Sequence, residues 1–163
     1  MKLRVSLALG VIAGFFMVVA HAQHATRADS PKKLQVIPFD EKSWPALTAK
    51  GPRPAAYLFT TSFCSTCPEA FSVIHSATLK ARQKVELAAV MMDVEGDKAR
   101  RHANHFHGMS KLYAFNGYET AIRYSVDPHW QNITPYVVLI DRHGVAQTMI
   151  GSPSHESLRV WLQ

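Results

Sequence analysis

The chain has 163 residues, of which 47% are hydrophobic and 18% charged, and this is enough for one globular domain with a buried core. Eighteen basic residues against twelve acidic ones give a net charge of +6. The basic residues are scattered and form no run, which argues against nucleic acid as a partner.

The N-terminal sequence has the three parts of a secretory signal peptide. Two basic residues precede an apolar stretch over residues 5–20, and Ala20 and Ala22 have the small-x-small spacing of a cleavage site. The apolar stretch has sixteen residues, fewer than the roughly 20 needed to span a bilayer. We therefore expect a signal peptide over residues 1–22, cleaved after Ala22, rather than an uncleaved membrane anchor. No stable membrane insertion is expected after cleavage.

The polar, aperiodic residues 23–33 predict a flexible N-terminal segment, and residues 34–163 predict one domain. Residues 34–37 are a short strand candidate, and Asp40 is a candidate cap for a helix over residues 43–49. Trp44 and Leu47 are expected on the inner face of that helix. A Gly/Pro cluster over 51–54 then precedes an apolar run over 55–60, which predicts a buried strand.

The only cysteines in the sequence, Cys64 and Cys67, lie between that strand and a helical pattern. A cysteine at such a junction lies near unpaired backbone N–H groups and the positive end of the helix dipole, which favours the thiolate. The second cysteine can attack a mixed disulfide formed by the first. A structural bridge in a redox-inert interaction domain is the alternative, but such bridges usually close longer loops. The helical pattern places these residues on one face: Ala70, Phe71, Ile74, Ala77 and Ala81.

The rest of the chain continues with alternating strand and helix patterns. A buried strand over 85–93 would complete a right-handed parallel strand–helix–strand unit with the strand over 55–60. The later elements expected are a helix over 97–105, a short strand over 111–115, a helix over 118–124, strands over 136–141 and 145–150 joined by a turn, and a helix from residue 154.

This order of elements, with Cys64 and Cys67 at the head of a helix and Thr134 and Pro135 directly before a hairpin strand, resembles thioredoxin. The segment over 97–127 resembles the insertion of TlpA-like periplasmic thioredoxins. The resemblance implies an α/β, thioredoxin-like fold. It would have a central mixed β-sheet flanked by helices, with the inserted segment before the proline hairpin.

The resemblance also implies a function: an exported, periplasmic thiol–disulfide oxidoreductase, with cytochrome c or copper-centre assembly as the expected setting. Cys64 would attack and Cys67 would resolve, while Thr134 and Pro135, after a cis peptide bond, would position the substrate. No cofactor is expected, because the dithiol itself carries two electrons. The expected partners are protein thiols or disulfides in the periplasm and a membrane electron donor.

The sequence departs from thioredoxin at three positions. Phe63 replaces a tryptophan, and Leu58 replaces a buried aspartate. Pro68 directly follows the second cysteine, so the first helical turn is either loosened or begins later than Cys64. Three acids are candidate substitutes for the aspartate, although solvated or capping roles are expected of them: Glu69, Asp93 and Glu95.

A weaker resemblance, to Sco-type copper chaperones, gives an alternative function. In that case Cys64, Cys67 and His129 would be the copper ligands. Sco-type proteins have three residues between the cysteines, whereas this chain has two.

A histidine-rich stretch contains His102, His105 and His107. On a helix, His102 and His105 would share a face and could hold a metal ion. We expect instead a solvated helix end, where histidine suits the negative end of the dipole.

Overall fold

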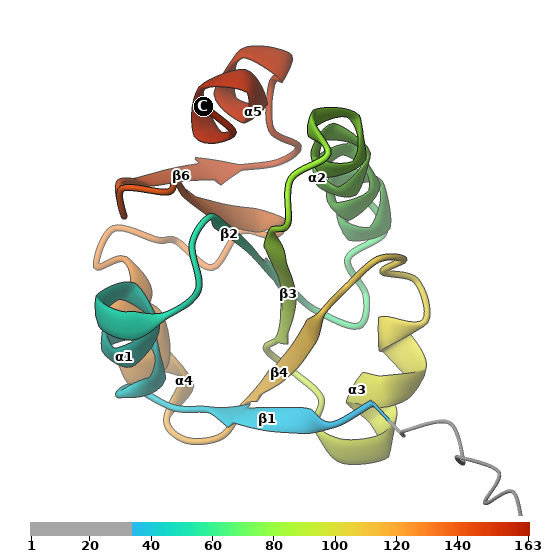
Figure 1. The fold of residues 1–163 in the computed structure, drawn as a ribbon. Helices are drawn as coiled ribbons and strands as arrows, with labels where there is room; N and C mark the ends of the chain where they lie inside the picture. The colour runs from blue at the N-terminus through green and yellow to red at the C-terminus, as the bar shows by residue number, and fades with distance from the viewer. Residues whose placement is uncertain (1–33) are drawn as a thin grey trace, which may run out of the picture. The chain divides into compact units, whose positions relative to one another are not determined.

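Figure 1 shows the computed structural model, which describes residues 34–163. The predicted signal peptide over 1–22 and flexible segment over 23–33 lie outside the described residues. No helix within 34–163 is long and apolar enough to cross a membrane. The elements are β1 (Val36–Phe39), α1 (Ser43–Lys50), β2 (Ala55–Thr60), α2 (Cys67–Ala81), β3 (Glu86–Met91), α3 (Gly96–Ala103), β4 (Lys111–Phe115), α4 (Glu119–Val126), β5 (Tyr136–Ile140), β6 (Ala146–Ile150) and α5 (His155–Trp161).

The strands form one mixed sheet in the order β1-β4-β3-β2-β5-β6. β1, β4, β3 and β2 are parallel, whereas β5 runs antiparallel to β2, and β6 antiparallel to β5. The predicted insertion supplies α3, β4 and α4, and its strand β4 lies between β3 and β1. The prediction of a mixed sheet flanked by helices is confirmed.

Helices cover both faces of the sheet (Figure 1). α2, α3 and α5 share one hydrophobic core with Leu58 and its same-face neighbours, and α1 and α4 share a second core with Phe59. Successive β2 side chains belong to opposite cores because side chains alternate along a strand. All six β2 residues are buried, as predicted for residues 55–60.

The first strand lies two residues later than predicted, at Val36–Phe39 rather than 34–37. Phe39 is fully buried and pairs with Phe115 of β4. Its ring also makes an edge contact with Phe59, at 5.7 Å between centroids. This aromatic cluster sets the register of the strand, because each ring buries a large apolar area.

The long helix α2 begins at Cys67. Of the two alternatives predicted from Pro68, a loosened first turn or a helix that begins later than Cys64, the structure shows the second. Pro68 then lies in the first turn, where its missing N–H is not needed. The predicted buried face is partly wrong at its C-terminal end. Ala81 is exposed and Ala77 only partly buried, whereas Thr78 is buried and donates its hydroxyl to the His75 carbonyl (2.7 Å).

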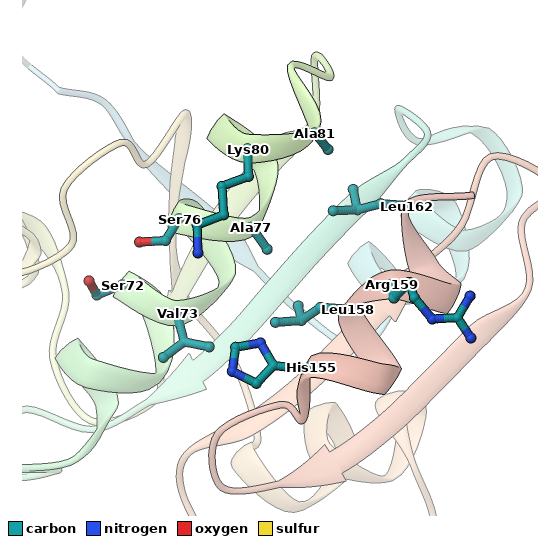
Figure 2. A pocket seen from close by; sticks show the side chains of 10 residues that line it. All are labelled: Ser72, Val73, Ser76, Ala77, Lys80, Ala81, His155, Leu158, Arg159 and Leu162. Atoms are coloured by element: carbon teal, nitrogen blue, oxygen red, sulfur yellow. The ribbon is translucent and has the colours of Figure 1, made fainter.

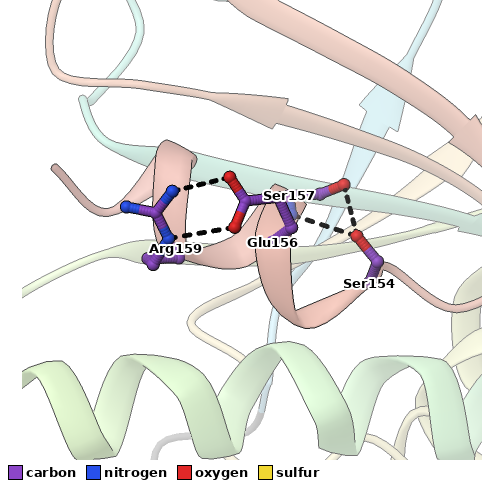
Figure 3. A network of polar contacts seen from close by, with 4 residues as sticks. All are labelled: Ser154, Glu156, Ser157 and Arg159. Carbon is purple, nitrogen blue, oxygen red and sulfur yellow. Dashed lines mark hydrogen bonds and ion pairs between the residues drawn. The ribbon is translucent and has the colours of Figure 1, made fainter.

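The last helix, α5, has a serine cap. Ser154 Oγ accepts a hydrogen bond from the backbone N–H of Ser157 (3.1 Å), and Arg159 pairs with Glu156 one turn later (Figure 3). Trp161 is buried and its Nε1 donates to the Ile140 carbonyl (2.8 Å), which attaches α5 to the sheet. A groove of about 540 Å³ lies between α2 and α5, with Val73, Ala77 and Leu158 among its lining side chains (Figure 2).

Candidate active site

Three loops meet at one end of the sheet, where β2 and β3 end and β5 begins. Thr60, the last residue of β2, pairs with Met91, the last residue of β3, and Phe59 pairs with Tyr136, the first residue of β5. The chain that leaves β2, the chain that leaves β3 and the chain that enters β5 therefore meet at the same end of the sheet. Cys64 lies in the first of these loops and Pro135 in the third.

Cys64 and Cys67 form a disulfide, with 5.5 Å between their Cα atoms. Cys64 lies in the loop ahead of α2 and is 9% exposed, whereas Cys67, the first residue of α2, is fully buried. The N–H of Cys67 donates to the Cys64 carbonyl (3.4 Å), and Thr66 Oγ1 lies 3.9 Å from Cys64 Sγ. Of the two cysteines, Cys64 is therefore the one with exposed surface.

The surroundings of the pair are apolar. Both cysteines belong to the core that also contains Leu58, Ala70 and Phe71. Within residues 34–163 no aspartate or glutamate is buried. With Leu58 in place of the thioredoxin aspartate, the described part of the chain has no buried carboxylate beside the disulfide.

Asp93 has a role that the sequence did not predict. It is exposed, as expected, but its Oδ1 and Oδ2 accept the backbone N–H of Ser62 (2.9 and 3.1 Å) and its Oδ2 accepts the Ser62 hydroxyl (2.6 Å). This carboxylate ties the end of β3 to the loop two residues before Cys64. The other two candidate acids, Glu69 and Glu95, are exposed.

The peptide bond between Thr134 and Pro135 is cis, and so is the bond between Arg53 and Pro54, which the sequence analysis did not predict. Pro135 is buried and its carbonyl accepts the N–H of Gly151 (2.8 Å). Thr134 is half-buried. Because proline has no N–H, the chain presents no backbone donor at this position toward the edge where Cys64 lies.

The loop that leads to Pro135 is fixed by three side chains that the sequence analysis did not single out. Trp130 stacks on Tyr136, with 4.3 Å between ring centroids, and donates its Nε1 to the Ile133 carbonyl (3.0 Å). The Tyr136 hydroxyl donates to Asp127 Oδ2 (2.6 Å), and this bond lowers the pKa of the Asp127 carboxyl. Burial and the same bond raise the pKa of Tyr136 well above its usual value.

The copper alternative gains no support from the geometry. Within residues 34–163, no three histidine, cysteine, aspartate or glutamate side chains form a group that could hold a metal ion. His129 is exposed, and its backbone N–H donates to Asp127 Oδ1 (2.8 Å). His102 and His105 do lie together, with 5.4 Å between their ring centroids, and His107 is exposed.

A mixed sheet in this order, with a Cys-x-x-Cys pair between β2 and α2 and a proline ahead of the β5–β6 hairpin, defines a thioredoxin-like fold. No protein-family model and no curated protein sequence matches the chain. Solved structures do match. A Chlorobium tepidum protein assigned as the thiol:disulfide interchange protein DsbE has a TM-score of 0.52 and 18% identity, over 72% of this chain and 85% of its own. This match confirms the fold.

Two further structures are similar. One is a secreted Mycobacterium tuberculosis disulfide oxidoreductase with a TM-score of 0.49 and 13% identity, over 68% of this chain and 80% of its own. The other is StoA from Bacillus subtilis, with a TM-score of 0.46 and 16% identity, over 68% of this chain and 83% of its own.

Proposed function

We propose that the protein is an exported thiol–disulfide oxidoreductase that exchanges the Cys64–Cys67 pair with partner proteins in the periplasm. The observation that carries this proposal is the asymmetry of the disulfide: Cys64, in the loop ahead of α2, is 9% exposed, whereas Cys67, the first residue of α2, is fully buried. The similarity of the fold to the Chlorobium tepidum protein assigned as a thiol:disulfide interchange protein supports it.

The exchange follows from this arrangement. In the reduced protein, the Cys64 thiolate attacks one sulfur of a substrate disulfide, a mixed disulfide forms, and the other substrate sulfur leaves as a thiolate. The Cys67 thiolate then attacks Cys64 Sγ, which restores the intramolecular disulfide and releases the second substrate thiolate. Two electrons pass from the protein to the substrate, and no cofactor is needed.

The segment around Thr134 and Pro135 is the proposed substrate-positioning element. It enters β5 at the end of the sheet where the Cys64 loop leaves β2. A substrate strand that approaches Cys64 could pair with the Thr134 backbone, as in other cases of β-strand addition. The exposed ring of Phe63 and the exposed side chain of Ile133 offer apolar surface on the two segments.

We infer that the protein acts as a reductant in cytochrome c or copper-centre assembly and is itself reduced by a membrane electron donor. The reduction potential of the Cys64–Cys67 pair tests this direction. A value below that of glutathione would support it, and each difference of about 30 mV, or 1.4 kcal/mol, shifts the exchange equilibrium about tenfold. A potential as high as those of strong disulfide oxidants contradicts it.

The test uses two single variants in a reduction assay with a protein disulfide. Cys64→Ala removes the attacking sulfur, so reduction is lost. Cys67→Ala keeps the attack but cannot resolve it, so a mixed disulfide with the substrate accumulates and is visible on a non-reducing gel. Wild-type activity in both variants contradicts the proposal. If, instead, the protein binds Cu(I) tightly and His129→Ala weakens that binding sharply, the copper-chaperone alternative holds.

A further inference from the structure

A basic pocket of about 360 Å³ lies directly beside the loop that carries the cysteines. Ser62, which Asp93 holds in place, forms its wall on the side of that loop. The opposite wall comes from α3 and the turn after it. The lining residues are Ser62, Val94, Lys98, Arg101, His102 and His105.

The basic side chains share one face of α3. Lys98, Arg101 and His102 have the i, i+3 and i+4 spacing of neighbours on a helix surface, while Ala99 and Ala103 are buried against the core. Like charges at this spacing destabilise a helix slightly. A negative group in the pocket would therefore be stabilised by the charges of both Lys98 and Arg101.

The acids nearby are engaged elsewhere or face another cavity. Asp93, Glu95, Asp97 and Glu119 border a neighbouring pocket of about 820 Å³, which Lys98 and Arg101 also line. Asp97 is paired with Arg100, and Glu119 with Arg123. The carboxylate of Asp93 accepts its hydrogen bonds from Ser62. Among residues 34–163, no ion pair joins Lys98 or Arg101 to a carboxylate.

His102 gives a second indication. Its ring packs against His105 and against Phe106, which in turn contacts Phe71 of α2, one turn after Cys67. Its Nε2 is buried without a hydrogen-bond partner in the described part of the chain. Burial first, and then the charge of His105, lower the pKa of His102, while Asp93 opposes this. A buried polar atom without a partner is uncommon in folded proteins, and this one belongs to a residue that lines the basic pocket.

We propose that this pocket is a carboxylate subsite that selects protein substrates with aspartate or glutamate close to the disulfide attacked by Cys64. The proposal rests on the proposed function, because the subsite acts only if Cys64 exchanges with a substrate. It concerns substrate choice alone and assigns the pocket no part in the chemistry.

The test compares disulfide peptides that differ only in having Glu, Gln or Lys beside the cysteines. At low ionic strength we expect the Glu peptides to react about fivefold faster in kcat/KM than the Gln peptides, through a lower KM with unchanged kcat. The preference should shrink in 0.5 M NaCl, because salt screens partly exposed charges. Lys98→Gln combined with Arg101→Gln should abolish it. Lys84→Gln combined with Arg142→Gln makes the same charge change at exposed positions outside the pocket and should keep it.

A binding measurement needs no chemistry. A Glu peptide with serines in place of its cysteines should shift the ring signals of His102 and His105 in NMR spectra, and the Gln peptide should not. Equal loss of preference in the control double variant overturns the proposal, because the effect would then be general surface charge. Absence of preference in the wild type also overturns it, provided that neutral hydroxyethyl disulfide is still reduced. If that compound is not reduced either, the oxidoreductase function itself fails, and the subsite with it.

Discussion

Tyr57 carries a buried hydroxyl group with no hydrogen-bond partner in the described part of the chain, in the middle of β2. A buried hydroxyl without a partner costs free energy that a phenyl ring does not. We expect Tyr57→Phe to raise the free energy of unfolding by about 1 kcal/mol. Tyr136→Phe is the matched control and should lower it by about 1 kcal/mol, because it removes the bond to Asp127. Urea denaturation measures both, and equal destabilisation by the two changes would contradict the interpretation.

The hydrogen bonds between Ser62 and Asp93 hold the loop ahead of Cys64 against the end of β3. Asp93→Asn and Ser62→Ala should each lower the free energy of unfolding by about 1 kcal/mol, the usual contribution of such bonds. Because both changes remove the same contact, the double variant should lose less than the sum of the two. Glu95→Gln, an exposed acid in the same turn, is the control and should have little effect. Strict additivity would show that the two residues act independently.

At the scale of elements, α5 depends on the cap that Ser154 provides (Figure 3). Ser154→Ala removes the acceptor for the Ser157 N–H and should cost about 1 kcal/mol of stability. Ser154→Asp keeps an acceptor at the cap and should retain most of it. Chemical denaturation of the two variants distinguishes a cap from a mere surface serine, for which both changes would be neutral.

The electrostatic surroundings of Cys64 also depend on where α2 begins. With the first helical residue at Cys67, Cys64 precedes the helix by one turn and Pro68 fits the first turn. The dipole of the helix therefore acts on Cys64 from a greater distance than it would if the helix began at Cys64 itself. The groove between α2 and α5 lies along residues 72–81 of α2, away from Cys67 at the start of the helix (Figure 2).

At the scale of the whole molecule, three tyrosines link folding stability to alkaline pH. Burial is the main cause that raises the pKa of Tyr57, Tyr113 and Tyr136 above the ordinary value of 10. In the unfolded chain these groups ionise from about pH 10, whereas the folded protein keeps them neutral. Their contribution is therefore fully present below pH 10 and is lost as pH rises beyond it.

We accordingly expect the urea midpoint of the oxidised protein to fall above about pH 10. Tyr136→Phe should make this fall shallower, because one of the three groups no longer titrates. An identical pH dependence in the wild type and this variant would contradict the assignment.

Export is the other prediction for the whole chain. The sequence predicts cleavage after Ala22, so the exported protein should begin at Gln23, which mass spectrometry of the intact protein can check. Ala22→Leu places a large residue at the cleavage site and should leave the precursor uncleaved. A wild-type protein that keeps residues 1–22 in the membrane fraction would show an anchor instead.

The sequence alone predicted the parts of this protein that depend on neighbouring residues. The bounds of β2 and β4 agree with the predicted ranges, because an apolar run or an alternation ended by turn residues is a local signal. The position of Cys64 and Cys67 between a strand and a helix followed in the same way. The resemblance to thioredoxin then gave the strand–helix arrangement, which the structure confirms.

The tertiary structure alone decided what depends on residues distant in the sequence. Asp93 lies 31 residues after Ser62 in the chain, and their contact exists only because β2 and β3 end side by side. The register of β1 was set by Phe115, and the basic pocket by α3 folding back to the cysteine loop. No periodicity within a short window records such contacts, because they arise from strand order and packing. The local sequence thus placed the two cysteines between a strand and a helix, and long-range packing determined what surrounds them.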